Sequence, residues 1–371
     1  MNRRTGLGVV AASVLALLAL PASAGAATKV VYAGPPAVTK QIAGKVIGAA
    51  GLNPQSFVKK YNPDVDNFFL HRVTINTGDT VSFQIEGFHT VDLPGKSGED
   101  LPLIVPGPTV HGAKDAAGNP FWFNGRVPSL GPNPVLFAPS TATTYDGTAR
   151  VDSGLPLGPP KPLNVQFTKP GVYKYFCDVH PGMVGYVVVK PKGATIPSAA
   201  QDKAALVNQI RGDVKTAVKI SKNRQPAHTV DLGQSGKGGV ELLAMFPSTL
   251  TVKAGTRVTF SMSPHSREVH TASFGPKAYL KPLANSFNSP VISPIAGYPS
   301  APSSIVLTPA SHGNGFANTG ILDRDSGTPA PATNRIDFKI PGVYHYQCLI
   351  HPFMHGTIVV KAAKARPKFT G

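Results

Sequence analysis

The chain of 371 residues contains two cysteines, and each begins the same short motif, Cys-x2-His-x2-Met. A thiolate, an imidazole and a thioether from one loop are ligands for a soft metal ion. Two His and one Cys with a weak axial Met form the ligand pattern of copper electron-transfer sites, so each loop needs one further His from upstream. The candidates for that ligand are His89 and His270. The motif residues are Cys177, His180 and Met183, and then Cys348, His351 and Met354.

Each of these residues also has a simpler interpretation. Two cysteines allow a disulfide bond, but it would place both in matching metal-ligand settings by coincidence. The methionines could be core residues, and the upstream histidines could be hydrogen-bonded surface residues. His265 competes with His270, but only His270 aligns with His89 and has Phe274 behind it. We therefore favour the metal sites.

An internal repeat supports two equivalent sites. Residues 167–189 and 338–360 align without gaps and agree at 13 of 23 positions, including the Cys, His and Met. Upstream, residues 73–83 match residues 250–260, and both alternate apolar and polar residues around a Gly turn. We predict strand, turn, strand for each, forming a hairpin, and a duplicated domain.

The composition favours short strands and many turns, with 38 Gly, 37 Pro and 15% charged residues. We predict an all-β chain of two tandem Greek-key β-sandwiches, residues 27–192 and 225–371. The apolar alternation places Val81, Phe83, Val258 and Phe260 in the cores.

Two segments have a helical pattern instead. In the linker at 193–224, Leu206, Ile210, Val214 and Ala217 or Val218 recur at helical spacing, and Ser198 is a suitable N-cap. This predicts an amphipathic linker helix. A shorter helix is predicted over residues 38–50. The long Pro- and Gly-rich insertions at 93–166 and 275–337 are expected to hold extra hairpins and loops, and the sequence does not show their role.

The N-terminus has the features of an export signal. Arg3 and Arg4 precede an apolar run from residue 7 to residue 20, followed by small residues suited to cleavage. We expect residues 1–26 to be a signal peptide, and the mature protein to be periplasmic, on the cell surface or extracellular. An uncleaved membrane anchor is the alternative, but the run is shorter than a spanning helix. The pattern leaves the general and twin-arginine export routes open.

A formal net charge of +17 bears on the partners of an exported protein. It favours an acidic redox partner or anionic cell-envelope polymers. The lysines and arginines are dispersed and no nucleic-acid-binding motif is present, so we expect no nucleic acid partner. A solvated basic surface without a specific partner is the alternative.

The two Cys loops resemble those of the cupredoxins, small blue-copper electron carriers. Residues 348–356, CLIHPFMHG, resemble the amicyanin loop most closely, and plastocyanin has a longer spacing from His to Met. The resemblance implies two mononuclear type 1 coppers per chain, with ligands from residues 89, 177, 180 and 183, and from 270, 348, 351 and 354. It also implies electron exchange through the exposed edge of each loop histidine, with Pro181 and Gly182 or Pro352 and Phe353 as the docking surface. Thr follows the first histidine of each repeat, where the family usually has Asn.

Two other functions compete with electron transfer. Copper nitrite reductases and two-domain laccases also contain two such domains, but they join the blue copper to a second centre through a histidine beside the Cys. Here the residues beside the cysteines are Phe176, Asp178, Gln347 and Leu349, and no His-x-His pair occurs. We therefore expect no enzymatic activity. Copper delivery is the second alternative, although delivery proteins usually expose Met or His clusters and this chain has 5 Met.

Overall fold

The computed structural model describes residues 26–363 except 97, 160 and 326. All but the last residue of the predicted signal peptide therefore lie outside the described part of the chain. Within that part, none of the helices is both long enough and apolar enough to cross a membrane.

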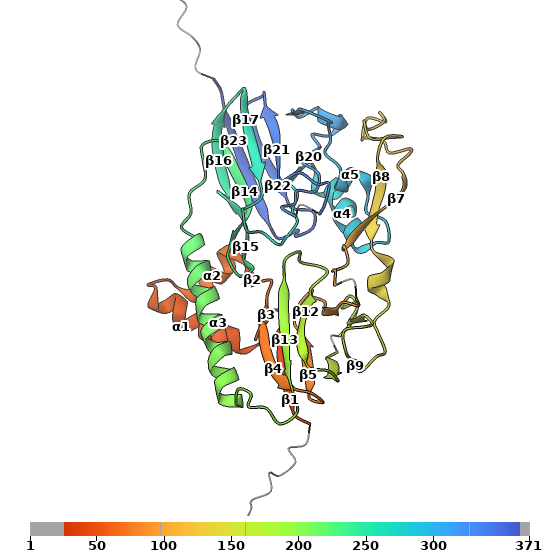
Figure 1. The fold of residues 1–371 in the computed structure, drawn as a ribbon. Helices are drawn as coiled ribbons and strands as arrows, with labels where there is room; N and C mark the ends of the chain where they lie inside the picture. The colour runs from red at the N-terminus through yellow and green to blue at the C-terminus, as the bar shows by residue number, and fades with distance from the viewer. Residues whose placement is uncertain (1–25, 97, 160, 326, 364–371) are drawn as a thin grey trace, which may run out of the picture.

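Two β-sandwiches form the body of the molecule, as the sequence predicts (Figure 1). In the first, a sheet of order β3-β1-β5-β11-β9 packs on a sheet of order β10-β6-β12-β13-β4. Its strands are β1 (Thr28–Ala33), β3 (Phe68–Phe69), β4 (Arg72–Asn76), β5 (Thr80–Ile85), β6 (Asp92–Leu93), β9 (Thr144–Tyr145), β10 (Val151–Asp152), β11 (Leu163–Phe167), β12 (Gly171–Phe176) and β13 (Val184–Lys190).

The second sandwich repeats this plan with orders β19-β21-β17-β14-β15-β2 and β16-β23-β22-β18-β20. Its strands are β2 (Pro63–Val65), β14 (Thr229–Gly236), β15 (Val240–Phe246), β16 (Thr249–Lys253), β17 (Thr256–Ser261), β18 (Ser273–Phe274), β19 (Ile305–Leu307), β20 (Ala317–Asn318), β21 (Thr333–Phe338), β22 (Gly342–Gln347) and β23 (His355–Lys361). The four predicted core residues at 81, 83, 258 and 260 are fully buried.

The strand, turn, strand segments are present, but the predicted hairpins are wrong. β4 pairs with β13 while β5 pairs with β1 and β11, so the two strands of this segment lie in opposite sheets. β16 and β17 are separated in the same way. The turns at Gly78 and Gly255 have φ of 90°, a left-handed conformation that glycine adopts without strain. In this arrangement Val73 and Val81 belong to opposite sheets and are buried in the same core cluster.

Three helices gather on one side of the junction between the two sandwiches (Figure 1). They are α1 (Val38–Ala49), α2 (Pro54–Tyr61) and α3 (Ala199–Ile220), and a capping box at Ser198 and Gln201 begins α3. The predicted apolar stripe of α3 is buried from Ile210 onward and partly buried at Leu206, and it packs with α1, α2 and β15 in one apolar cluster. β2, which lies in the first predicted domain, pairs with β15 of the second. This side of the junction is therefore covered by chain from both halves.

The two long insertions form a second junction on the opposite side. The first contains the hairpin β7 (Ile104–Thr109) and β8 (Pro128–Pro132) and the short 3-10 helix η1 (Pro134–Phe137). The second contains α4 (Lys277–Asn285), α5 (Pro294–Gly297), η2 (Ser286–Asn288) and η3 (Ser311–Gly313). Phe121 and Phe123 from the first insertion pack with Leu280 and Phe316 from the second in one buried cluster. Trp122 Nε1 also donates to the carbonyl of Pro299 at 2.7 Å. The insertions therefore hold the sandwiches together.

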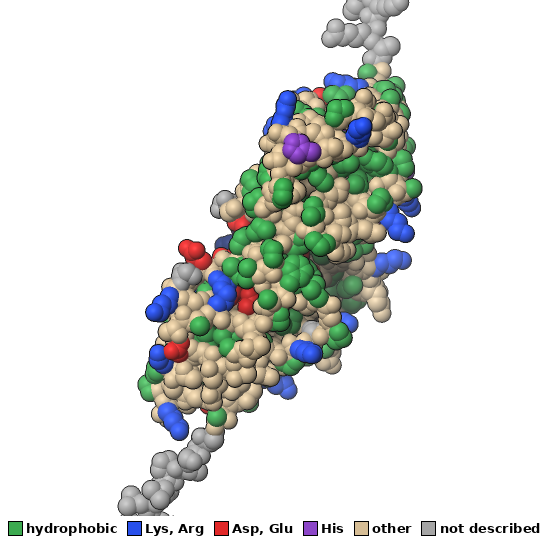
Figure 2. Space-filling model, turned by 90° about the vertical axis from the view of Figure 1, so that its right-hand side faces the viewer, with side chains coloured by type: hydrophobic (Ala, Val, Ile, Leu, Met, Phe, Trp, Pro, Cys, Tyr) green, Lys and Arg blue, Asp and Glu red, His purple; other side chains and the backbone are tan. Residues whose placement is uncertain are grey.

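The surface over the insertions is more apolar than its surroundings. Figure 2 shows hydrophobic side chains gathered across the middle of this face, with lysines and arginines scattered singly around it. The positive charge is thus spread over this face rather than concentrated in one patch.

Candidate metal centres

The first predicted site is assembled at one end of the first sandwich. Cys177 follows β12, Met183 precedes β13 and His89 follows β5. The Cys177 Sγ lies 3.8 Å from Nδ1 of His89 and 3.6 Å from Nδ1 of His180. The backbone N–H of Cys177 donates to the carbonyl of Met183 at 3.1 Å, closing the loop, and the Met183 side chain is fully buried.

The second site repeats this geometry. The Cys348 Sγ lies 3.7 Å from Nδ1 of His270 and 3.9 Å from Nδ1 of His351. The loop closes with a backbone hydrogen bond of 3.0 Å from Cys348 to the carbonyl of Met354, which is also buried. His270 therefore takes the place for which His265 competed. Both cysteines are free thiols, so the disulfide alternative is not what this structure shows.

A threonine ties each upstream histidine segment to its Cys loop. The backbone N–H of Asp178 donates to Oγ1 of Thr90, and the backbone N–H of Leu349 donates to Oγ1 of Thr271, each at 2.8 Å. The backbone N–H of each threonine also points to the Cys Sγ, at 3.4 Å. In both domains a threonine hydroxyl therefore joins the histidine segment to the Cys loop, at the position where cupredoxins usually have Asn.

Two glycines that sequence reasoning did not single out lie behind the upstream histidines. A Cβ on Gly34 would lie 2.8 Å from Nε2 of His89, and one on Gly233 would lie 3.2 Å from Nε2 of His270. Both glycines have a positive φ; Gly34 directly follows β1, and Gly233 lies within β14. The equivalent positions of these glycines in the two repeats could have indicated them. They allow each ring to turn its Nδ1 toward the sulfur.

The surroundings of the two thiols favour the thiolate. Burial alone raises the pKa of the Cys177 thiol, but the contacts with His180 and His89 outweigh it and hold the pKa well below the ordinary value. The pKa of the Cys348 thiol is lowered in the same way against burial by His270 and His351. Thiolate is the form of cysteine that binds a metal.

The outer edges of the two loop histidines do not point to solvent as the resemblance implies. Nε2 of His180 lies 3.3 Å from Oε1 of Glu268, and Nε2 of His351 lies 3.4 Å from Oε2 of the same residue. Asp66 lies behind, with Oδ1 at 3.8 Å from Nε2 of His180. A carboxylate only accepts hydrogen bonds, so these contacts favour hydrogen on Nε2 and a free lone pair on Nδ1.

The three carboxyl groups of this interdomain cluster differ in the direction of their pKa shifts. Burial raises the pKa of Glu268, but the charge of His180 and the contact with it, together with His351 and His270, hold the pKa below its ordinary value. Burial raises the pKa of Asp66 and of Glu241 well above the ordinary values. These opposite directions favour the charged form at Glu268 over Asp66 and Glu241.

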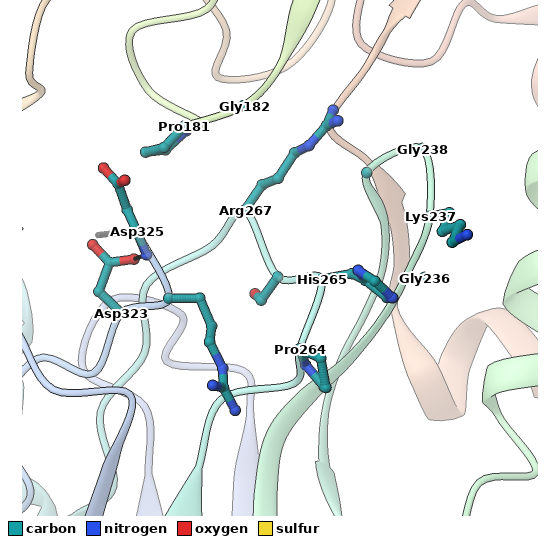
Figure 3. A pocket seen from close by; sticks show the side chains of 13 residues that line it. Pro181, Gly182, Gly236, Lys237, Gly238, Pro264, His265, Arg267, Asp323 and Asp325 are labelled. Carbon is teal, nitrogen blue, oxygen red and sulfur yellow. Dashed lines mark hydrogen bonds between the residues drawn. The ribbon is translucent and has the colours of Figure 1, made fainter. Parts of the chain in front are cut away.

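A pocket opens beside this cluster, with a volume of about 520 Å³. Figure 3 shows Pro181 and Gly182 from the first loop on one side and Asp323 and Asp325 from the second domain near them, with Arg267 extending along the wall. The guanidinium of Arg267 donates to the carbonyl of Asp66. The first loop therefore lies opposite residues of the second domain across this pocket.

The electrostatic surroundings differ behind the two cysteines. Asp178 follows Cys177, accepts from Thr90 and from the Leu101 backbone, and lies near Asp92. Burial, above all, raises the pKa of Asp178 to about 7 and that of Asp92 to about 8. Leu349, which is buried, takes the equivalent place in the second site. The two sites are alike in donors but not in the charge around them.

No protein-family model and no curated protein matches this sequence. Solved structures do match, and the three named below each cover little more than a third of the chain. The structures that it resembles are cupredoxins. An amicyanin mutant in the Cu(I) state has 18% identity and a TM-score of 0.21, covering 38% of this chain and 89% of its own.

Two further cupredoxins match to a similar degree. The plastocyanin of Dryopteris crassirhizoma has 18% identity and a TM-score of 0.21, covering 36% of this chain and 99% of its own. The purple cupredoxin of Nitrosopumilus maritimus has 18% identity and a TM-score of 0.20, covering 37% and 100%. Because the identities and TM-scores are low, the assignment of the two metal sites depends on the residues of this chain.

The residues present fit a copper ion in both sites. Each site brings together one thiol and two imidazoles, with all three donor atoms within 4.8 Å of one another. Sulfur and nitrogen donors in a trigonal set, with a buried Met in the same loop, are typical of copper electron-transfer centres. Nε2 of His270 has no hydrogen-bond partner among the described residues, so that ring depends on its Nδ1 for polar contacts.

Proposed function

We propose that this chain is an exported electron-transfer protein that holds one mononuclear type 1 copper ion in each domain. The observation that carries the proposal is the duplicated contact of a buried thiol with two imidazole Nδ1 atoms. The ligands of the first ion are His89, Cys177, His180 and Met183, and those of the second are His270, Cys348, His351 and Met354. Copper supplies one-electron chemistry, and the residues hold a geometry that suits both oxidation states.

The protein rather than the metal fixes this geometry. The Thr90 and Thr271 hydroxyls join the segments that carry the ligands, and buried glycines place the upstream rings. Ligands that cannot move favour fast electron exchange, because little has to rearrange when the charge changes. Hydrogen bonds to the Cys sulfur and burial set the potential of each site.

The second site is the better placed of the two for exchange with a partner. The His180 side chain is 7% exposed and the His351 side chain 17%. Phe353 is half exposed, and its ring lies 5.8 Å from that of His351. Of the two docking surfaces that the resemblance offers, we propose that a redox partner with an acidic surface docks at Phe353 and Pro352.

The proposal is tested by removing one thiolate at a time. Cys177→Ser should abolish the thiolate-to-copper absorption of the first site and leave that of the second, and Cys348→Ser should do the converse. Copper content per chain, visible absorption and electron paramagnetic resonance spectra of each variant provide the readout. Loss of both signals in either variant would contradict two independent ligand sets. Oxygen or nitrite turnover by the copper-loaded protein would favour an enzyme instead.

A further inference from the structure

One side chain lies between the two candidate copper sites. Each carboxylate oxygen of Glu268 faces a different loop histidine, Oε1 toward His180 and Oε2 toward His351, at 3.3 and 3.4 Å. Glu268 is buried, with 8% of its surface exposed, so solvent screens its contacts with the two histidines only weakly. In the first repeat, Gly87 stands at the position equivalent to Glu268, two residues before the upstream histidine. The bridge is therefore a feature of the pair of domains and not of the repeated unit.

The segment that carries Glu268 is held by both domains. The backbone N–H of Arg267 donates to Oε1 of Glu241 at 2.9 Å, and the Arg267 guanidinium reaches the carbonyl of Asp66 across the junction. Ser266 Oγ accepts from the backbone N–H of Glu268 at 3.2 Å. The two apolar clusters formed by the helices and by the insertions lie on the two sides of this junction. The carboxylate is thereby fixed relative to both histidines.

We propose that Glu268 joins the two metal sites into one electron-exchange unit. This inference rests on the proposed function. Each histidine would hold its metal through Nδ1 and meet the shared carboxylate through Nε2, so a short chain of polar contacts connects the sites. Exchange moves one electron: the site that loses it is oxidised and the other is reduced. No bond forms or breaks and no outside reactant is needed.

A third metal ion is the competing interpretation of this cluster. Donor atoms of Asp66, His180 and Glu268 also lie within 4.8 Å of one another. The contact of Glu268 with His351 as well, and the nearby guanidinium of Arg267, favour a bridge between imidazoles. The two interpretations differ in the number of metal ions bound per chain.

The first test reads the histidine rings directly. In the protein loaded with Cu(I), which is diamagnetic, nuclear magnetic resonance should detect the Nε2–H protons of His180 and His351. Glu268→Ala should shift both resonances, because both acceptor oxygens are removed. The isosteric Glu268→Gln should shift at least one, because an amide keeps one acceptor oxygen and replaces the other with an NH2 group. Asp337→Asn is the control, since Asp337 is a buried carboxylate of the same domain that pairs with Arg257. Rings that do not respond to Glu268→Ala would overturn the bridge.

The second test measures exchange between the sites. After an added photosensitiser, excited by a light pulse, donates one electron to part of the copper, the two absorption bands should re-equilibrate at a rate independent of protein concentration. We expect Glu268→Gln to slow this rate at least tenfold and Asp337→Asn to change it less than twofold. A rate proportional to protein concentration, an unchanged rate in Glu268→Gln, or a third metal ion lost in Glu268→Gln would overturn the inference. Failure to bind copper at all would instead contradict the proposed function.

Discussion

The hydroxyl oxygen of Thr271 lies 2.8 Å from the backbone nitrogen of Leu349 and accepts its hydrogen bond. Both residues are buried, and each directly follows a candidate copper ligand. Thr90 and Asp178 make the same contact in the first domain. In each domain, one hydrogen bond thus joins two segments that are distant in the sequence and that meet at the metal site.

Removing this hydroxyl should loosen the second site. In Thr271→Val, which keeps the shape, a buried N–H loses its acceptor, and we expect a loss of roughly 1 to 3 kcal/mol in the free energy of unfolding. Denaturant unfolding of the metal-free protein measures it. Thr271→Ser keeps the hydroxyl and should lose less. Equal stability of the wild type and Thr271→Val would contradict the role of this hydrogen bond.

The charge difference between the sites should appear in their reduction potentials. Asp178 places a carboxylate beside Cys177, and an anion near the metal favours the oxidised form. At pH 9, where Asp178 is ionised, Asp178→Asn should raise the reduction potential of the first site by about 40 mV. For one electron this shift corresponds to roughly 1 kcal/mol. Spectroelectrochemical titration measures it. The second site should not shift, and a fall in the first potential would contradict the electrostatic account.

Much of this arrangement could be predicted from the sequence, because the information is local or repeated. The Cys motif, the upstream His89 and His270 and the apolar alternation of the strands recur in both halves, and the helical spacing of α3 is regular. The hairpins were mispredicted because alternation around a Gly turn does not tell whether the next strand pairs with the first or crosses to the facing sheet. Only the pairing of β4 with β13 and of β5 with β1 and β11 shows which.

The rest depended on contacts between distant segments. Glu268 is a single acidic residue with no pattern around it, and its role appears only when the two loops face each other. The insertions lack periodicity, so their common cluster could not be predicted. In the same way, nothing in the sequence indicates that His180 is turned toward the second domain.

The cluster between the insertions should contribute strongly to stability. Phe123 is fully buried and its ring lies 5.6 Å from that of Tyr298. Phe123→Ala should lower the free energy of unfolding by about 3 to 5 kcal/mol, because a large buried side chain is lost and a cavity remains. Val291→Ala is the control, since Val291 is 56% exposed, and it should change stability by less than about 0.5 kcal/mol. Similar losses in the two variants would contradict the role of this cluster.

A partly buried carboxyl on α3 should make stability depend on pH. Burial raises the pKa of Asp213 from 3.8 to about 7, with Arg267 acting against this. The folded state therefore holds this proton more tightly than the unfolded state, so its contribution to stability falls as the pH rises from about 4 to about 7.

Replacing this group should remove that dependence. Asp213→Asn should be more stable than the wild type at pH 8, by roughly 1 to 3 kcal/mol after allowance for partial exposure, and nearly equal to it at pH 4. Urea unfolding at the two pH values measures the difference. If Asp213→Asn differed from the wild type in stability by the same amount at pH 4 and pH 8, ionisation of Asp213 would not be the cause of the pH dependence.

The most direct test of the account is the metal content and the spectrum of the copper-loaded mature protein. Two copper ions per chain, both with the strong visible absorption of a thiolate-bound Cu(II) and the narrow hyperfine splitting of a type 1 site, are the predicted result. A protein that binds no copper, or whose bound copper is colourless in the oxidised state, would contradict it.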